Sequence, residues 1–173
     1  MTATTSAKIV TAAAQYGVPP DLALRVATQE SGGNQAAVSS AGAIGVMQLM
    51  PATAAGLGVD PYNEDANIAG GMKYLSQMYG RYGDWNNAVA AYNAGPGTID
   101  KVLAGIRELP AETVNYLSRI LGISSLDAGS DVVYTSGASD TYDDSAALSG
   151  SAPWVLAAAA AGGVAVLWLA FRR

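Results

Sequence analysis

Apolar residues recur at intervals of three and four positions along the first 121 residues, and Gly, Pro and Asp separate these stretches from one another. This spacing places apolar side chains on one face of a helix. No stretch of useful length alternates apolar and polar residues as a half-buried strand does. The pattern therefore predicts a mostly helical domain over residues 1–121, long enough for one modest core.

Residues that favour helix ends predict where the individual helices begin and stop. Pro20-Asp21 indicates a start, because Pro is tolerated in the first turn and Asp is favoured there, and Gly32-Gly33 indicates the end. Two further helices are expected to start near Asp65 and after Asp84, with these side chains as caps, and the second should end at Gly95-Pro96. The remaining predicted helices cover the N-terminal residues, residues 99–104 and residues 111–121.

Two regions beyond residue 121 differ in composition from this domain. Residues 122–152 are rich in Ser, Gly, Asp and Ala and carry five Asp and no basic residue. Such a segment buries too little apolar surface to offset the entropy lost on ordering, so we expect a flexible linker. Residues 154–171 then form a run of 18 residues without a charge. As a helix, this run would span roughly 27 Å, which is close to the hydrocarbon thickness of a bilayer.

Residues 153–173 are therefore predicted to form a C-terminal transmembrane anchor. A Trp stands near each end of the apolar run, and Arg172-Arg173 follows directly, as is typical at membrane interfaces. A buried Ala-rich core helix is the alternative interpretation of this segment. The N-terminal apolar run is too short for a secretory signal, so an anchor is expected without an export signal.

The composition excludes several kinds of chemistry. The chain contains no Cys and no His. Disulfides, thiolate nucleophiles, Ser-His pairs and Cys- or His-based zinc sites are therefore excluded. The net charge of −5 argues against a nucleic-acid partner. Carboxylates, hydroxyls, amides and Lys remain as reactive groups, and we expect neither a metal nor a cofactor.

Glu30 occupies an unusual position for an acidic residue. The residues three, four and seven positions before it are Ala27, Val26 and Ala23, so it lies on the apolar face of its predicted helix. Loss of hydration of the charged form raises the pKa of a carboxyl group. A Glu that stays protonated near neutral pH can act as the general acid in glycosidic cleavage. The alternative is a Glu at a helix end that turns outward to water.

Four motifs appear in order along the first two thirds of the chain. They are QESGGN at 29–34, GAIGVMQLMPATA at 42–54, AVAAYNAGPG at 88–97 and LPAETVNY at 109–116. Their order and spacing resemble the soluble lytic transglycosylase family, which is related to goose-type lysozymes and cuts bacterial peptidoglycan. The resemblance covers residues 17–121 and implies a mostly helical, lysozyme-like fold.

The resemblance also implies roles for individual residues. Glu30 matches the catalytic acid of the family, and Ser31 matches the neighbouring hydroxyl that helps to orient the sugar. The usual Gly-Leu-Met-Gln motif appears here with Val46 in place of Leu. The residues implied to bind the saccharide, including the Tyr-Asn pair that faces the acid, are Ser31, Met47, Gln48, Tyr92, Asn93 and Tyr116. Tyr116 also matches a tyrosine of the family that lies near the catalytic carboxyl.

The acids of the domain suggest a mechanism with a single carboxyl group. A retaining glycosidase needs two carboxyls about 5–5.5 Å apart, and an inverting one needs about 6.5–9.5 Å. Asp21 lies nine residues before Glu30, so it is roughly 13 Å away along the helix axis. The other acids fit helix caps, first turns or loops, and no second catalytic carboxylate is evident. The family resemblance then implies cleavage between N-acetylmuramic acid (MurNAc) and N-acetylglucosamine (GlcNAc), with formation of a 1,6-anhydro ring.

The expected partners are peptidoglycan glycan strands, a lipid bilayer through residues 153–173, and other virion or membrane-complex proteins. A catalytic domain with a linker and an anchor predicts a virion-associated enzyme of a membrane-containing bacteriophage, which opens the cell wall for genome delivery. One alternative is a lysozyme-type hydrolase. Another is a wall-remodelling enzyme of a secretion or conjugation apparatus, in the bacterial inner membrane facing the periplasm. A wall-binding protein without catalytic activity is the third.

Overall fold

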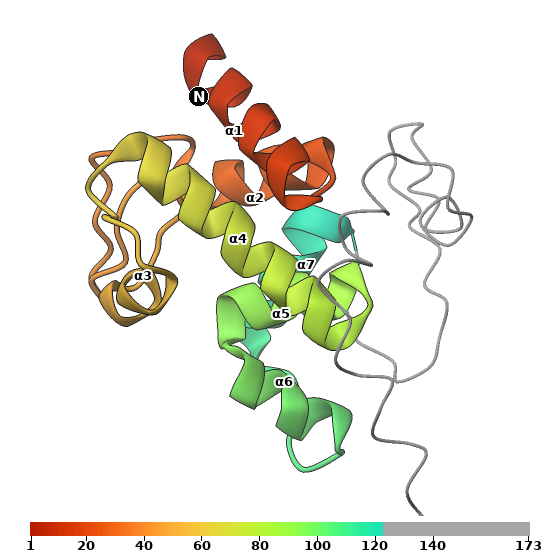
Figure 1. Cartoon of the computed structure of the whole chain (residues 1–173). Helices are drawn as coiled ribbons and strands as arrows, with labels where there is room; N and C mark the ends of the chain where they lie inside the picture. Colours follow the sequence, from red (N-terminus) through yellow and green to blue (C-terminus); the bar gives the residue numbers. More distant parts are fainter. Residues whose placement is uncertain (123–173) are drawn as a thin grey trace, which may run out of the picture. The chain divides into compact units, whose positions relative to one another are not determined.

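The computed structural model describes residues 1–122, which form seven α-helices and no β-strand. Figure 1 shows them in order along the chain. The helices are α1 (Ala3–Tyr16), α2 (Pro20–Ser31), α3 (Pro51–Leu57), α4 (Glu64–Tyr82), α5 (Trp85–Ala94), α6 (Pro96–Leu103) and α7 (Ala111–Leu121). This part of the chain is therefore mostly helical, as the apolar periodicity predicts.

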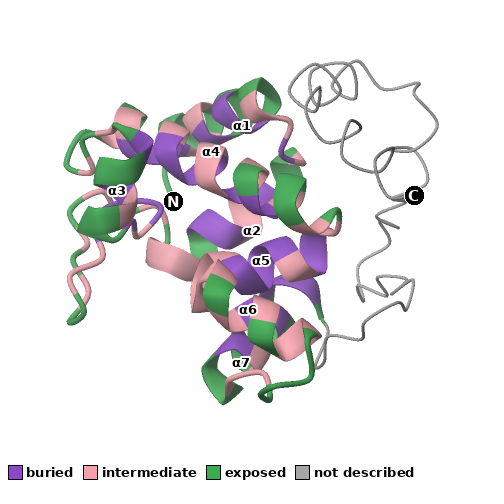
Figure 2. Cartoon of the chain, turned by 60° about the horizontal axis from the view of Figure 1, so that its bottom comes forward, coloured by how far each residue is buried: buried purple, intermediate pink, exposed green. Residues whose placement is uncertain are grey.

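The long helix α4 is the centre of the packing. It contacts α1, α3 and α5, while α5 packs on α6 and α7, and α2 joins α1 to α7 (Figure 1). One apolar core unites these elements, and Figure 2 shows that α5 is buried along most of its length. Met72 of α4, Val89 of α5 and Leu117 of α7 are fully buried in this core. Removal of such apolar surface from water is the main stabilising contribution to the fold.

Three helices have the ends that the sequence predicts. α2 begins at Pro20 and ends where Gly32 takes a left-handed conformation with φ of 65°. α5 begins after Asp84, whose side chain accepts the Asn87 N–H at 2.7 Å. α7 covers residues 111–121. At these positions the helix boundaries agree with the local end signals.

One helix cap and one helix start differ from the prediction. The N-cap of α4 is Asn63, whose side-chain oxygen accepts the N–H of the third residue after it at 3.0 Å. Asp65 is therefore not the cap but lies in the first turn, where it pairs with Lys8 of α1 at 2.8 Å. α6 begins at Pro96 and not at residue 99, because Pro fits the first helical position.

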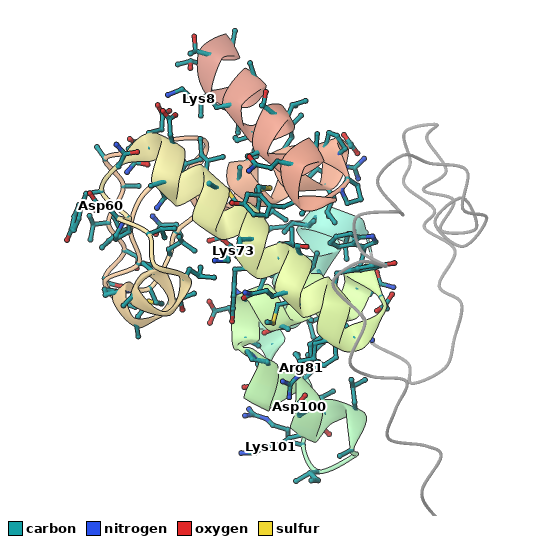
Figure 3. All side chains as sticks on the ribbon, in the orientation of Figure 1. Lys8, Asp60, Lys73, Arg81, Asp100 and Lys101 are labelled. Atoms are coloured by element: carbon teal, nitrogen blue, oxygen red, sulfur yellow. The ribbon has the colours of Figure 1, made fainter. Side chains whose placement is uncertain are left out.

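α3 has no counterpart among the predicted helices. It contains seven residues, of which only Ala54 and Leu57 are buried, so it is too short to show an apolar period. Lys73 of α4 donates from its Nζ to the Leu57 carbonyl at 3.2 Å (Figure 3). This hydrogen bond links α4 to the C-terminal end of α3.

Among residues 1–122, no helix is both long and apolar enough to cross a bilayer. The predicted linker beyond residue 122 and the predicted anchor at residues 153–173 lie outside the described residues. α7 ends at Leu121, where the sequence places the end of the helical domain. The division of the chain into domain, linker and anchor stays a prediction.

Candidate active site

Glu30 lies in the last turn of α2, on the face that packs into the core. Ala27 and Val26, three and four residues before it, are fully buried, and side chains at these spacings share one side of a helix. Burial raises the pKa of the Glu30 carboxyl from 4.5 to about 7, because the ionised form loses water. A hydrogen bond from Tyr116 acts in the opposite direction and is the smaller effect. The carboxyl is therefore divided between its protonated and ionised forms near neutral pH.

Two tyrosines from two other helices lie near this carboxyl, and a third packs on one of them. Tyr116 of α7 donates its hydroxyl to Glu30 Oε1. Burial raises the pKa of both Tyr116 and Tyr92 of α5 well above the ordinary value, and the nearby Glu30 charge adds to each effect. The Tyr92 ring also contacts the Tyr74 ring of α4, with centroids 5.4 Å apart. Both buried phenols are thus neutral hydrogen-bond donors whenever the acid is at work.

Ser31 connects the end of α2 to the residues around position 46. Its Oγ donates to the Val46 carbonyl at 2.8 Å, and it accepts the N–H groups of Gly33 at 3.2 Å and Asn34 at 3.0 Å. One donor and two acceptor positions are all that a hydroxyl offers. A sugar contact by Ser31, which the family resemblance implies, would have to replace one of these bonds.

Met47 is completely buried, with 0% of its surface exposed. Its side chain packs against Gly71 of α4, where an added Cβ would lie 2.5 Å from Met47 Cγ. The Met47 side chain thus belongs to the core, and the role at the saccharide site that the family resemblance implies for this residue stays a prediction. Its backbone serves the site, because the Met47 carbonyl accepts the Tyr92 hydroxyl at 2.7 Å.

The side chains of Gln48 and Asn93 form hydrogen bonds with other residues of the helical domain. Gln48 has a φ of 46°, in the left-handed region that non-glycine residues rarely adopt. Its amide donates to the carbonyls of Ala37 at 3.2 Å and Gly45 at 3.0 Å. Asn93 accepts the Thr113 hydroxyl at 2.9 Å, which ties α5 to α7. Within residues 1–122 no group accepts the amide N–H of Asn93, so it is available to a ligand.

Several other acids of the helical domain are paired away from Glu30. Glu64 and Asp65 pair with Lys8 at 2.5 and 2.8 Å. Asp100 pairs with Arg81 of α4 at 2.6 Å (Figure 3). Burial raises the pKa of Glu30 and the Tyr116 phenol partly offsets this rise, and no second carboxylate contributes to the shift. Residues 1–122 contain no group of three or more side chains suited to hold a metal ion.

Two amide side chains near the site are absent from the sequence prediction. Gln35 and Asn67 hydrogen-bond the backbone N–H groups of residues 46 and 47. A signal for Asn67 does exist in the sequence. It stands three and four positions before Gly70 and Gly71, so the three share one face of α4, on which the two glycines allow close approach of another segment.

Comparison with known proteins relates this arrangement to a family. Residues 8–115, more than half of the chain, match the family model described as the transglycosylase SLT domain. The chain is 48% identical over 85 residues to a transglycosylase of Enterobacteria phage PRD1, which covers 49% of this chain and 32% of that protein. It is 32% identical over 126 residues to the membrane-bound lytic murein transglycosylase C of Histophilus somni, covering 61% of this chain and 35% of that protein.

A solved structure shows the same helical fold. It is that of an inactive Glu-to-Gln mutant of the lytic transglycosylase Slt from Pseudomonas aeruginosa. The TM-score is 0.58 and the identity 31%, over 66% of this chain and 22% of that one. The chain thus spans between about a fifth and a third of the length of these relatives. With its family model, four motifs and helical fold in agreement, the chain belongs to the transglycosylase SLT domain family.

Proposed function

We propose that the protein is a peptidoglycan lytic transglycosylase, which cleaves the β-1,4 bond between MurNAc and GlcNAc and leaves a 1,6-anhydro-MurNAc end. The observation that carries this proposal is Glu30, a single carboxyl with a pKa raised to about 7. It accepts a hydrogen bond from Tyr116 and has no second acid beside it among residues 1–122. The relative from Histophilus somni, named a lytic murein transglycosylase, supports the substrate class.

The first step uses the protonated form of Glu30. Its carboxyl donates a proton to the oxygen that bridges the two sugars, and the bond from this oxygen to C1 of MurNAc breaks. A glycosidase with two carboxylates would stabilise the developing positive charge with the second one. Here the N-acetyl group of MurNAc takes that role, because within residues 1–122 no second carboxylate contributes to the environment of Glu30. Because burial raises the pKa of Glu30 to about 7, the protonated form that this step requires is available near neutral pH.

The second step uses the ionised form that the first step leaves behind. The Glu30 carboxylate accepts the proton of the MurNAc C6 hydroxyl while the C6 oxygen forms its bond to C1. This closes the anhydro ring, returns the proton to Glu30 and consumes no water. The Tyr116 hydroxyl, which donates to Glu30, stabilises the carboxylate between the two steps. A nucleophile tethered in the substrate also has a high effective concentration.

A comparison of two carboxyl-to-amide variants tests whether Glu30 performs the chemistry. Glu30→Gln keeps the size and the acceptor for Tyr116 but cannot transfer the proton, so the rate of wall solubilisation should fall at least about a hundredfold. Glu112→Gln is the matched control, because Glu112 is an exposed acid in the first turn of α7. The assay is the loss of turbidity of purified sacculi. A Glu30→Gln protein that retains near wild-type activity would contradict the proposal.

For the biological setting, we propose a virion-associated enzyme of a membrane-containing bacteriophage, anchored in the virion membrane by residues 153–173. The similarity to the phage PRD1 transglycosylase and the uncharged run at residues 154–171 support this setting. The partners would then be the bilayer, other virion proteins and the host cell wall. A wall-remodelling enzyme of a secretion or conjugation apparatus in the inner membrane is the alternative.

Fractionation distinguishes the two settings. In the phage setting the protein is present in purified virions and is released from them by detergent but not by high salt. Detection of the protein in envelopes of cells that carry no phage would contradict the phage setting and favour the secretion or conjugation apparatus.

A further inference from the structure

Val46 and Met47 form a buried dipeptide that holds two side chains beside the acid. Both residues are 0% exposed, yet neither belongs to a helix or strand, so their backbone polar groups need partners from elsewhere. The two carbonyls accept the hydroxyls of Ser31 at 2.8 Å and of Tyr92 at 2.7 Å. Ser31 follows Glu30 in the chain, and Tyr92 lies close enough to respond to its charge. The position of the dipeptide thus determines the position of both neighbours of the acid.

Two amide side chains hold the same dipeptide from its other side. The Val46 N–H donates to Gln35 Oε1 at 3.2 Å, and the Met47 N–H donates to Asn67 Oδ1 at 2.8 Å. The amide nitrogens of Gln35 and Asn67 both donate to one carbonyl, that of Pro61, at 3.0 Å each. The two side chains therefore form one unit, which we call the amide clamp. All four backbone polar groups of the dipeptide are bound by side chains.

The packing around Asn67 leaves this part of the clamp little freedom to move. Asn67 is 0% exposed, and its second N–H donates to the Ile44 carbonyl at 2.8 Å, so each of its polar hydrogens has an acceptor. An added Cβ at Gly45 would lie 2.5 Å from Asn67 Nδ2, and one at Gly71 would lie 2.5 Å from Met47 Cγ. The backbone of residues 44–49 therefore packs directly on α4.

We propose that Gln35 and Asn67 are positioning residues of the active site, which act through Val46 and Met47 on the hydroxyls of Ser31 and Tyr92. Neither amide contacts Glu30. Their effect on catalysis is therefore transmitted by the dipeptide, and it rests on the proposed transglycosylase function. A residue that only stabilises the fold would change the amount of folded protein and leave the turnover of folded protein unchanged.

A double-mutant cycle separates positioning from stability. Asn67→Ala should lower kcat on purified sacculi at least tenfold, measured on folded protein well below its melting temperature. Tyr92→Phe has no hydroxyl to bond the Met47 carbonyl, so in that background Asn67→Ala should have less than a third of this effect. Equal effects in the two backgrounds would overturn the proposal.

Gln35 provides a second cycle that does not depend on a fully buried residue. Gln35 is only partly buried, so Gln35→Met should fold even where Asn67→Ala does not. Gln35→Met should lower kcat severalfold in the wild-type background and have little effect in the Ser31→Ala background. The matched control is Asn63→Ala, which removes the N-cap of α4 and makes no contact with the dipeptide. It should lower the melting temperature and leave kcat unchanged, and a loss of kcat equal to that of Asn67→Ala would overturn the proposal.

A measurement without substrate keeps this proposal distinct from the proposed function. The carbon resonance of the Glu30 carboxyl reports its titration directly in the full chain. Release of Tyr92 admits water to Glu30, so the titration midpoint should fall in Asn67→Ala and stay at the wild-type value in Asn63→Ala. A wild-type chain without activity on sacculi would refute the proposed function alone. An unchanged Glu30 midpoint in both amide variants would overturn the amide clamp as a positioning device.

Discussion

At the scale of single residues, the chemistry depends on how much free energy it takes to ionise Glu30. The apolar face of α2 surrounds the carboxyl and raises its pKa, while the hydroxyl of Tyr116 partly offsets this effect. Both influences are needed in a two-step mechanism. The first keeps a proton available at neutral pH, and the second makes the carboxylate stable enough to exist as an intermediate.

The alkaline side of the pH–activity profile should report the pKa of Glu30. Activity needs the protonated acid, so the rate should fall as the pH rises through about 7. Tyr116→Phe removes the hydrogen bond that lowers this pKa, so the fall should move to higher pH while the maximum rate decreases. Initial rates on sacculi between about pH 5 and pH 9 provide the measurement.

Tyr62→Phe is the control for this comparison, because Tyr62 is 71% exposed and its ring lies at the surface. Its profile should coincide with that of the wild type. A Tyr116→Phe profile that moves to lower pH would contradict the assigned hydrogen bond, in which the phenol donates to the carboxylate.

Glu30→Gln should change the dependence of stability on pH. The folded pKa of Glu30 lies above its ordinary value, so the folded state binds this proton more tightly than the unfolded chain. The stabilisation is complete below about pH 4.5 and is lost as the pH rises to about 7. The variant lacks this loss, so above pH 7 its stability relative to the wild type should be higher than at acidic pH by on the order of 3 kcal/mol. Urea unfolding at acidic and alkaline pH gives the two differences, and an equal difference at both would contradict the account.

At the scale of the elements, local signals in the sequence predict most of the helices. The Pro-Asp start and Gly-Gly end of α2 and the Asp84 cap of α5 each lie within one turn of the boundary that they determine. The N-cap of α4 could not be predicted in this way. Asn63, Glu64 and Asp65 are consecutive polar residues, and only the three-dimensional path of the chain selects Asn63. The seven residues of α3 are too few to show an apolar period.

The active site can be predicted only in part, because several of its contacts join residues that are far apart in the sequence. The apolar neighbours of Glu30 are within seven positions of it, so its burial can be read from the sequence. Its contact with Tyr116 joins residues 86 positions apart, which no local pattern reveals, and only the family resemblance pointed to it. The hydrogen bond from the Tyr92 hydroxyl to the Met47 carbonyl could not be predicted either, because sequence motifs describe side chains and not backbone groups. Gln35 and Asn67 are not predicted from the sequence, because their side chains bind backbone N–H groups of the site.

Two glycines of α4 should respond to alanine in opposite directions. Gly71→Ala places a Cβ 2.5 Å from Met47 Cγ, so it should destabilise the fold by about 1–3 kcal/mol and reduce activity. Gly80→Ala meets nothing within 4 Å and lies in the same helix, so it should stabilise by about 0.5–1 kcal/mol with unchanged activity. Denaturant unfolding measures both changes. Equal effects at the two positions would contradict the close packing of residues 44–49 on α4.

At the scale of the whole molecule, the acid and the tyrosines near it come from helices that share one core. α2 contributes the acid, α5 contributes Tyr92 and α7 contributes Tyr116, while Tyr74 of α4 packs on the Tyr92 ring. All four lie within residues 1–122. The proposed chemistry therefore requires nothing from the predicted linker or anchor, which would serve only to place the domain near the wall.

Deletion of residues 153–173 should separate catalysis from membrane attachment. We expect the shortened chain to release muropeptides from sacculi in solution at the wild-type rate and to lose its sedimentation with lipid vesicles. The measurements are muropeptide release and vesicle co-sedimentation, with the full chain as reference. A shortened protein that is folded by circular dichroism but inactive would contradict the independence of the domain.

The sugar end that the enzyme leaves identifies the nucleophile of the proposed reaction most directly. Sacculi are digested with the full chain in water enriched in oxygen-18, and the released muropeptides are weighed by mass spectrometry. Intramolecular attack by the C6 hydroxyl predicts muropeptides one water lighter than hydrolysis products, without the heavy isotope at the cleaved end. Muropeptides that carry a labelled oxygen at C1 would show that water is the nucleophile and would contradict the transglycosylase mechanism.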